Sequence, residues 1–161
     1  MTEKLNDVIS RVVVDTFEKL AFMFAFPEEG KGTEPSGDLV RAGVSFLGPF
    51  SGQVVICISS VVLPELGANM LGMDDEAGVT LENQHDALKE AINVICGNLL
   101  PAIAGEEPVF NMDMPRILSL NDIPSGDHLA RVRLEFDDGH CEVMVHLDGQ
   151  IPEEITNQIA L

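Results

Sequence analysis

Two bulky aromatic residue types are missing from this chain, which has no Trp and no Tyr among its 161 residues. Eight Phe and seven Met must supply the large apolar side chains, and a chain of this length can bury a core. Basic residues are also scarce, with 9 Lys and Arg against 27 Asp and Glu and a formal net charge of -18. Such an acidic chain repels nucleic-acid phosphates and anionic lipid headgroups, so neither nucleic acid nor membrane is expected as a partner.

Long apolar runs and paired cysteines are missing as well. No apolar run approaches the roughly 20 residues of a membrane helix, and the N-terminus is polar, without the basic start of a secretory signal. Cys57, Cys96 and Cys141 are widely spaced and lie in apolar segments, which favours reduced, buried thiols in a cytoplasmic protein. There is no C-x-x-C and no pair of histidines at helical spacing, so no metal site is predicted.

Hydrophobic periodicity predicts two helices in the first half of the chain. Apolar residues recur at helical spacing over 6–25, with Phe24 as the last member of the stripe, and Pro27 ends the pattern. A shorter helix is expected at about 61–71, ending at Gly72.

The longest predicted helix covers about 81–104. Thr80 is its expected N-cap, and Gly105 can close its C-terminal end. Pro101 lies inside the segment and lacks the N–H that would bond to the Gly97 carbonyl. It is therefore expected to kink the last turn or to end the regular helix early.

Alternation of apolar and polar residues predicts two hairpins, 39–47 with 53–59 and 130–136 with 141–147. A surface loop is expected at 28–37, and a short strand at 109–113 is followed by a proline-containing loop. The order of helix, hairpin and short helix, then helix, hairpin and a terminal helical segment, indicates an internal pseudo-repeat. We therefore expect one α+β domain over 1–161, with a mostly antiparallel sheet and both long helices packed on one face.

The helix at 81–104 has an apolar side and a polar side. At about 100° per residue, the apolar side collects Leu88, Ala91, Ile92, Ile95, Leu99 and Ala102, and the opposite arc collects Asp86, Glu90, Asn93 and Gly97. A glycine within a helix costs about 1 kcal/mol relative to alanine. Gly97 would let the backbone of another molecule approach this face of the helix closely. Alternatively, it marks tight internal packing or accommodates Pro101.

The pattern E-x-x-N is weak evidence alone, because the chain contains it at Glu3–Asn6, Glu90–Asn93 and Glu154–Asn157. Only the middle copy lies within a predicted helix, opposite an apolar stripe. Asp86 precedes this copy, and Gly97 and Asn98 follow it.

The pattern from Asp86 through Glu90 and Asn93 to Gly97-Asn98 resembles the signature helix of the CheC/CheX/FliY chemotaxis phosphatases, with an arrangement closest to CheX. The resemblance extends over roughly 8–147. It includes Val44-Ser45-Phe46-Leu47-Gly48 in the first hairpin, Ala68-Asn69-Met70-Leu71-Gly72-Met73 in the short helix, and Phe110-Asn111-Met112-Asp113-Met114-Pro115 after the long one.

The resemblance implies a CheC-like fold and a phosphatase that dephosphorylates the aspartyl-phosphate of a CheY-like receiver domain. It implies that Glu90 pairs with the receiver's lysine and that Asn93 orients the attacking water. Asp86, Gly97 and Asn98 would then contribute to docking. The receiver would supply its own Mg²⁺, so no cofactor is expected here, and a homodimer is expected by analogy with CheX.

The chain departs from the family pattern at two places. Ala91 follows the signature Glu, where relatives more often have Leu, and the smaller side chain should not block docking. Some relatives carry a second E-x-x-N on the first helix, but the matching stretch here is Glu18-Lys19-Leu20-Ala21, which lacks the Asn. One active site per chain is the consequence.

Two other functions remain open at this stage. A non-catalytic module of the same fold could bind a receiver or flagellar partner through its surface alone. An acidic small-molecule-binding domain is the third alternative, although the chain has no Gly-rich phosphate loop and no cofactor signature. Retention of both Glu90 and Asn93 favours catalysis.

Overall fold

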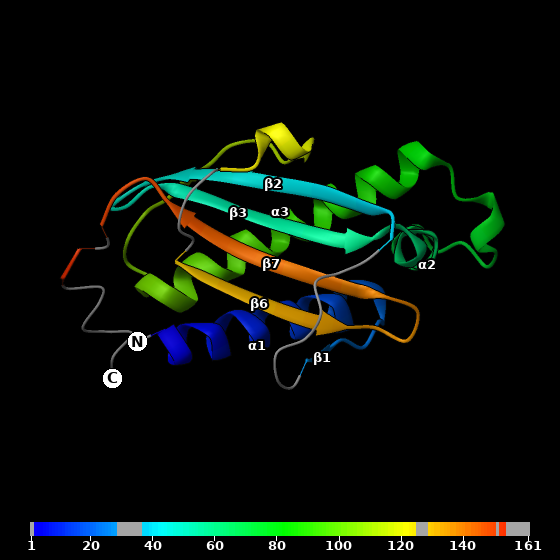
Figure 1. Cartoon of the computed structure of the whole chain (residues 1–161), viewed down its shortest axis with the longest axis horizontal. Coiled ribbons are helices and arrows are strands. Elements are labelled where there is room, and N and C mark those ends of the chain that lie inside the picture. The colour runs from blue at the N-terminus through cyan, green and yellow to red at the C-terminus, as the bar shows by residue number, and fades with distance from the viewer. Residues whose placement is uncertain (1, 29–36, 125–128, 151, 154–161) are drawn as a thin grey trace.

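The structure, a computed structural model, describes residues 2–28, 37–124, 129–150 and 152–153 (Figure 1). Its helices are α1 (Thr2–Ala21), α2 (Leu63–Leu71) and α3 (Leu81–Ala104), with 3₁₀ turns at Ser60–Val62, Glu76–Gly78 and Leu120–Asp122. Its strands are β1 (Phe26–Pro27), β2 (Leu39–Leu47), β3 (Gly52–Ser59), β4 (Asn111–Met112), β5 (Arg116–Leu118), β6 (Ala130–Glu135) and β7 (His140–Leu147).

The strands form one sheet in the order β1-β6-β7-β3-β2-β4, and β5 also pairs with β2. Every pairing is antiparallel. The two predicted hairpins are confirmed, and they meet where β3 pairs with β7 in the middle of the sheet. The register aligns valines across adjacent strands, because Val54 lies opposite both Val44 and Val145. These cross-strand pairs give one face of the sheet a continuous apolar surface.

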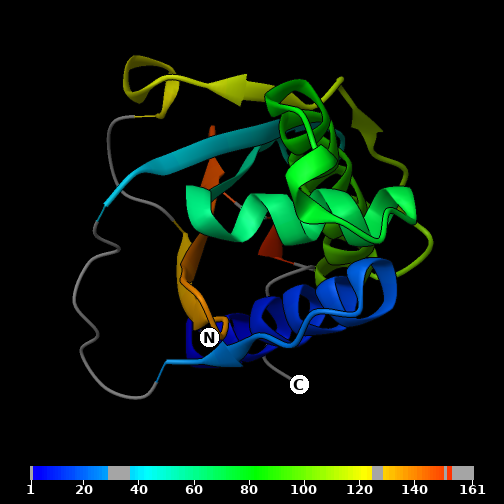
Figure 2. The same cartoon turned by 90° about the vertical axis from the view of Figure 1, so that its right-hand side faces the viewer.

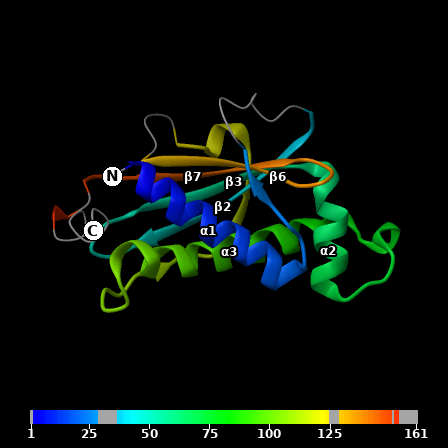
Figure 3. The same ribbon diagram turned by 90° about the horizontal axis from the view of Figure 1, so that it is seen from below.

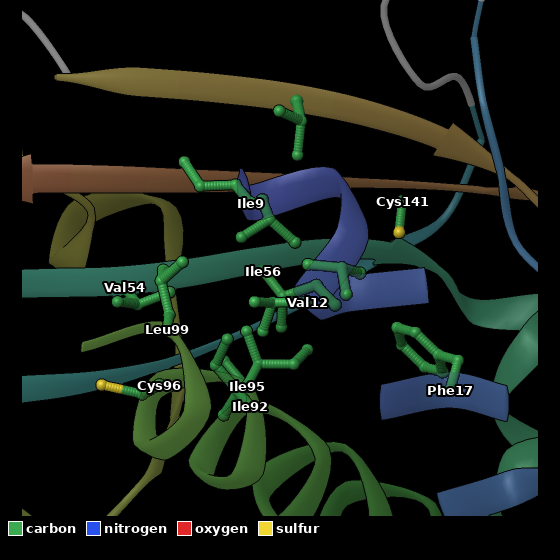
Figure 4. Close-up of a cluster of buried hydrophobic side chains, with 14 of the residues drawn as sticks. Ile9, Val12, Phe17, Val54, Ile56, Ile92, Ile95, Cys96, Leu99 and Cys141 are labelled. Carbon is green, nitrogen blue, oxygen red and sulfur yellow. The ribbon is translucent and has the colours of Figure 1, made fainter. Parts of the chain in front are cut away.

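Both long helices cover that apolar face, as Figures 2 and 3 show from two directions. Between the helices and the sheet lies the hydrophobic core, which includes Ile9 and Phe17 from α1, Ile56 from β3, and Ile95 from α3 (Figure 4). The predicted α+β class, antiparallel sheet and one-sided placement of the helices are therefore confirmed. Each long helix precedes one hairpin in the chain, but the relation between the two halves remains a prediction.

The prediction of a helix over 6–25 was wrong at both ends, because α1 spans Thr2–Ala21. Its last carbonyl, on Ala21, accepts a hydrogen bond from the Asn69 side-chain amide at 2.7 Å. The next residue, Phe22, takes a positive φ of 52°, which breaks the helix. Phe24 is consequently 62% exposed and not part of the core stripe.

The ends of α3 follow the predicted caps. The Asn83 N–H donates to the Thr80 hydroxyl oxygen at 3.1 Å, and the Gly105 N–H donates to the Pro101 carbonyl at 2.8 Å. An early end at Pro101 was wrong, because the helix continues to Ala104. Pro101 and Gly97 both lie on the exposed side, so water can reach the carbonyl that the proline leaves without an N–H partner.

Two further sequence expectations need correction. Ala102 was placed on the apolar side of the long helix but is exposed, and Ile103 and Ala104 are buried in the last turn instead. The strand expected at 109–113 is only the two-residue β4, and the loop expected after it contains β5. A three-residue strand is too short to show a period of two.

Helix α3 is long and apolar enough to pass a simple test for a membrane span, with a mean hydropathy of 1.2. However, 56% of that apolar window is buried inside the fold. The core helix of a globular domain passes the same test, so its length and composition are weak evidence for a membrane segment. Most of the 28–37 loop lies outside the described residues, and so does most of the predicted terminal helical segment, because only 152–153 are described after residue 150.

Candidate functional site

The core fixes which way α3 faces. Leu88, Ile92 and Ile95 are fully buried, so one side of the helix is held against the sheet. Residues about 180° away around the helix must then point outward. Asp86, Glu90, Gly97 and Asn98 are exposed, and Asn93 is half-buried.

Glu90 and Asn93 lie one helical turn apart on this outward side. Within the part of the chain that the structure describes, neither side chain makes a hydrogen bond or an ion pair. A carboxylate and an amide therefore remain available to a partner, side by side on a rigid helix. Residues held in this way can position a ligand without reorganising.

Asp86, expected to contribute to docking, is already engaged. Its carboxylate lies 3.1 Å from the Lys89 ammonium, three residues further along α3. The pair is solvent-exposed and stabilises the helix by no more than about 0.5 kcal/mol. The ion pair nevertheless matters to the site, because it gives Lys89 a partner other than the neighbouring Glu90.

Gly97 has open space where a side chain would begin. A Cβ atom there would meet only the Met112 sulfur, at 3.9 Å, outside the backbone of its own helix. This is ordinary van der Waals contact, and no side-chain atom of Pro101 comes within 4 Å. Tight internal packing therefore does not explain the glycine, whereas a partner that approaches α3 from outside would.

The structure adds a groove that sequence reasoning missed. A pocket of about 360 Å³ lies between α1 and α3. It is lined by Val12, Asp15, Thr16, Lys19, Leu20, Val94 and Asn98. In the sequence, residues 18–21 are notable only for the Asn that they lack. Nothing in a linear pattern pairs them with Val94 and Asn98.

The other copies of E-x-x-N do not form comparable sites. Asn6 on α1 is half-buried, and its side-chain oxygen is shielded from solvent without a hydrogen-bond partner among the described residues. Glu154 and Asn157 lie outside the described residues. On α1 the residue three positions after Glu18 is Ala21, which is wholly buried.

Neither metal nor thiol chemistry is apparent in the described ranges. No group of three or more His, Cys, Asp or Glu side chains there is placed to hold a metal ion. Cys57, Cys96 and Cys141 are buried and free. Burial raises the pKa of the Cys96 thiol to about 12 and also raises the pKa values of Cys57 and Cys141. The reactive thiolate form is therefore disfavoured at all three positions.

Solved structures with the same fold include several chemotaxis proteins. A CheX from Vibrio vulnificus matches with a TM-score of 0.69 at 16% identity, covering 89% of this chain and 96% of that one. The complex of CheX with CheY, BeF₃ and Mg²⁺ from Borrelia burgdorferi matches with a TM-score of 0.66 at 18% identity, covering 89% and 97%. FliY from Thermotoga maritima matches with a TM-score of 0.55 at 17% identity, covering 99% and 96%. At identities this low, the structural matches show a shared fold and nothing more.

Comparison with curated protein sequences returns no match. The sequence does match a family described as "Chemotaxis phosphatase CheX" over residues 40–137, which is more than half of the chain. That range runs from the second residue of β2 to the second residue after β6 and includes all of α3 with its polar side. The chain therefore belongs to the CheX family of chemotaxis phosphatases.

Proposed function

We propose that this chain hydrolyses the aspartyl-phosphate of a CheY-like receiver domain, with Asn93 orienting the attacking water and Glu90 pairing with the receiver's lysine. Membership of the CheX family supports a phosphatase, and the Borrelia burgdorferi complex supports a CheY-like partner. The observation that carries the proposal is the exposed Glu90 and the adjacent Asn93, one turn apart on α3 and without internal partners among the described residues.

The reaction requires little covalent chemistry from the phosphatase. Water attacks the phosphorus, and the bond from phosphorus to the aspartate oxygen breaks. The receiver's aspartate side chain returns to its carboxylate form, and the inorganic phosphate leaves with both protons of the water. The receiver supplies Mg²⁺ and a lysine, which stabilise the charge on the phosphoryl oxygens and the departing carboxylate. What remains is to hold one water in line with the bond that breaks, and correct positioning of this kind can be worth orders of magnitude in rate.

Asn93 suits this task because a carboxamide both accepts and donates hydrogen bonds. Its oxygen can accept a hydrogen bond from the water while the side chain stays neutral next to an anionic phosphoryl group. Glu90 suits a different task, since an unpaired carboxylate can attract the receiver's lysine and so fix the orientation of the complex. Asn93 therefore acts in catalysis, and Glu90 acts in binding.

The test measures phosphate release from a Mg²⁺-loaded receiver domain charged with acetyl phosphate, with and without this protein. The wild type should accelerate release, and Asn93→Ala should lower that acceleration about 100-fold while binding to the receiver stays close to that of the wild type. Asn6→Ala, in another copy of the pattern, is the matched control and should keep full activity. Full activity in Asn93→Ala would exclude the proposed role of the amide.

A non-catalytic binding module is the second candidate. It needs only the surface of the fold, because one fold can carry different functions and does not by itself imply catalysis. In the same assay, a module would bind the receiver without changing the rate of phosphate loss. It would also be insensitive to Asn93→Ala.

We further propose that the protein acts in the cytoplasm as a homodimer. The sheet ends in the very short strand β1 on one side, and β4 and β5 each cover only part of β2 on the other. Incompletely paired edges are natural templates for strand pairing between identical subunits. Light scattering over a range of concentrations should report a dimer, and a monomer at high concentration would refute this part of the proposal.

A further inference from the structure

The groove between α1 and α3 borders the polar side of α3. The two helices lie together on the same face of the sheet (Figure 3), and the pocket of about 360 Å³ opens between them. Its α3 wall consists of Val94, which follows Asn93, and Asn98, which follows Gly97. At about 100° per residue these side chains lie roughly 40° and 80° around the helix from Glu90. A protein that covers Glu90 and Gly97 therefore also reaches the groove.

The floor of the groove is apolar. Leu20 and Val94 are only half-buried, so each still exposes part of an apolar side chain to water. Thr16 is buried, and its hydroxyl donates to the Val12 carbonyl at 2.7 Å, so this hydroxyl is already satisfied. An apolar side chain from a partner would gain free energy by entering here, because it would displace water from these surfaces.

The rim carries one charge of each sign. Asp15 and Lys19 are exposed on α1 at a spacing that suits a helical ion pair, yet no ion pair between them is found in the described structure. Lys19 is also one of only nine basic residues in a chain of net charge -18. Unpaired charges around an apolar floor are typical of the rim of a protein-binding surface.

We infer that this groove is a second contact surface for the receiver domain, beside the site on α3. An apolar side chain near the receiver's phosphorylation pocket enters the groove between Leu20 and Val94. On either side of it, an acidic side chain of the receiver pairs with Lys19 and a basic one pairs with Asp15. The inference rests on the proposed function and assigns the groove to binding and partner choice. Hydrolysis itself stays with α3.

The argument for the receiver as occupant is continuity with the candidate site. Helix α1 has no exposed amide at the position where some relatives carry a second Asn, since Ala21 is buried at the end of the helix. The exposed residues of α1 are therefore not part of a second active site, and they can contact a receiver that is bound at α3. Contacts on both helices would hold the receiver in one orientation above Asn93, as an ordered water requires.

The experiment uses two groove variants of the full chain, Lys19→Glu at the exposed rim and Val94→Phe, which fills the floor. Arg11→Glu on α1 and Val109→Phe are matched controls at exposed positions outside the groove. Binding is measured by calorimetry with a receiver loaded with Mg²⁺ and beryllium fluoride, which mimics the phosphoryl group. Phosphate release is measured over a range of receiver concentrations.

Both groove variants should raise the Kd and the KM about tenfold while kcat stays within about twofold of the wild type. The controls should match the wild type. Unchanged Kd and KM in both groove variants, with an active wild type, would overturn the groove assignment and leave the proposed function standing. A wild type that neither binds nor dephosphorylates receivers would overturn the proposed function and the inference together. A change only in self-association, seen by light scattering, would assign the groove to a second copy of the chain and overturn the inference.

Discussion

The two long helices of this fold lie on the same face of the sheet, but only α3 carries the candidate site (Figure 3). Both bury an apolar stripe, with Ile9 on α1 and Ile95 on α3 each fully buried. They differ on their outward sides. Helix α3 presents Glu90 with Asn93 one turn later, whereas on α1 the residue one turn after the exposed Glu18 is the buried Ala21. A shared structural role therefore says nothing about a shared catalytic role.

The largest expected effect tests what the helices share. Ile9→Ala and Ile95→Ala should each lower the free energy of unfolding by about 2–5 kcal/mol, because each removes a wholly buried side chain from the same core. Urea denaturation measures both. Val109→Ala, at a position that is 76% exposed, should change stability by less than about 0.5 kcal/mol. A small effect at Ile9 alone would show that α1 contributes less to the core than α3.

The next effect tests what α1 lacks. Ala21→Asn creates an E-x-x-N pattern on α1 that begins at Glu18, but the substituted position has no exposed surface. Burying an amide without prepared partners should cost about 1–3 kcal/mol of stability. It should also add no phosphate release when combined with Asn93→Ala. Recovery of activity in that double variant would show that α1 can serve as a second site.

The end of α1 shows where prediction from sequence stops. Apolar residues continue at helical spacing as far as Phe24, so periodicity extends the helix past its real end. The end is instead marked by contacts from elsewhere in the chain, because the Asn69 amide caps the Ala21 carbonyl and Phe22 turns to positive φ. Long periodic segments, by contrast, were read correctly, as both hairpins and α3 show.

The candidate site divides in the same way. The polar side of α3 could be predicted, because Glu90, Asn93 and Gly97 follow one another at helical spacing opposite an apolar stripe. The ion pair of Asp86 with Lys89 was missed, although a spacing of three residues on one helix favours it. The groove could not be predicted, because it joins Lys19 to Val94 only after the chain has folded. Contacts between distant segments leave no period in the sequence.

Gly97→Leu should separate docking from folding on α3. The helix should tolerate the substitution, since a Cβ at this position has open space and leucine favours helix by up to about 1 kcal/mol over glycine. The longer side chain stands where the receiver is proposed to land, so binding should weaken about tenfold, or about 1.4 kcal/mol.

Calorimetry with the beryllium fluoride-loaded receiver measures binding, and urea denaturation measures stability. Gly97→Ala is the matched control, with a similar gain in stability and a smaller loss of binding. Loss of stability in both variants would instead point to an internal packing role for the glycine.

The smallest expected effect concerns Glu90 and returns to the contrast between the helices. Glu90→Ala removes the proposed partner of the receiver's lysine and should raise the Kd by no more than about fivefold, because a partly solvated ion pair contributes about 1 kcal/mol or less. Glu90→Gln keeps the shape and should lose the same amount, since the charge is what matters. Added salt should bring the wild type towards both variants, because screening weakens the same interaction. Glu18→Ala removes an exposed carboxylate of the same type from α1 and should leave the Kd unchanged. Equal losses at Glu18 and Glu90 would mean that the receiver responds to the overall acidity of the helical face and not to one carboxylate on α3.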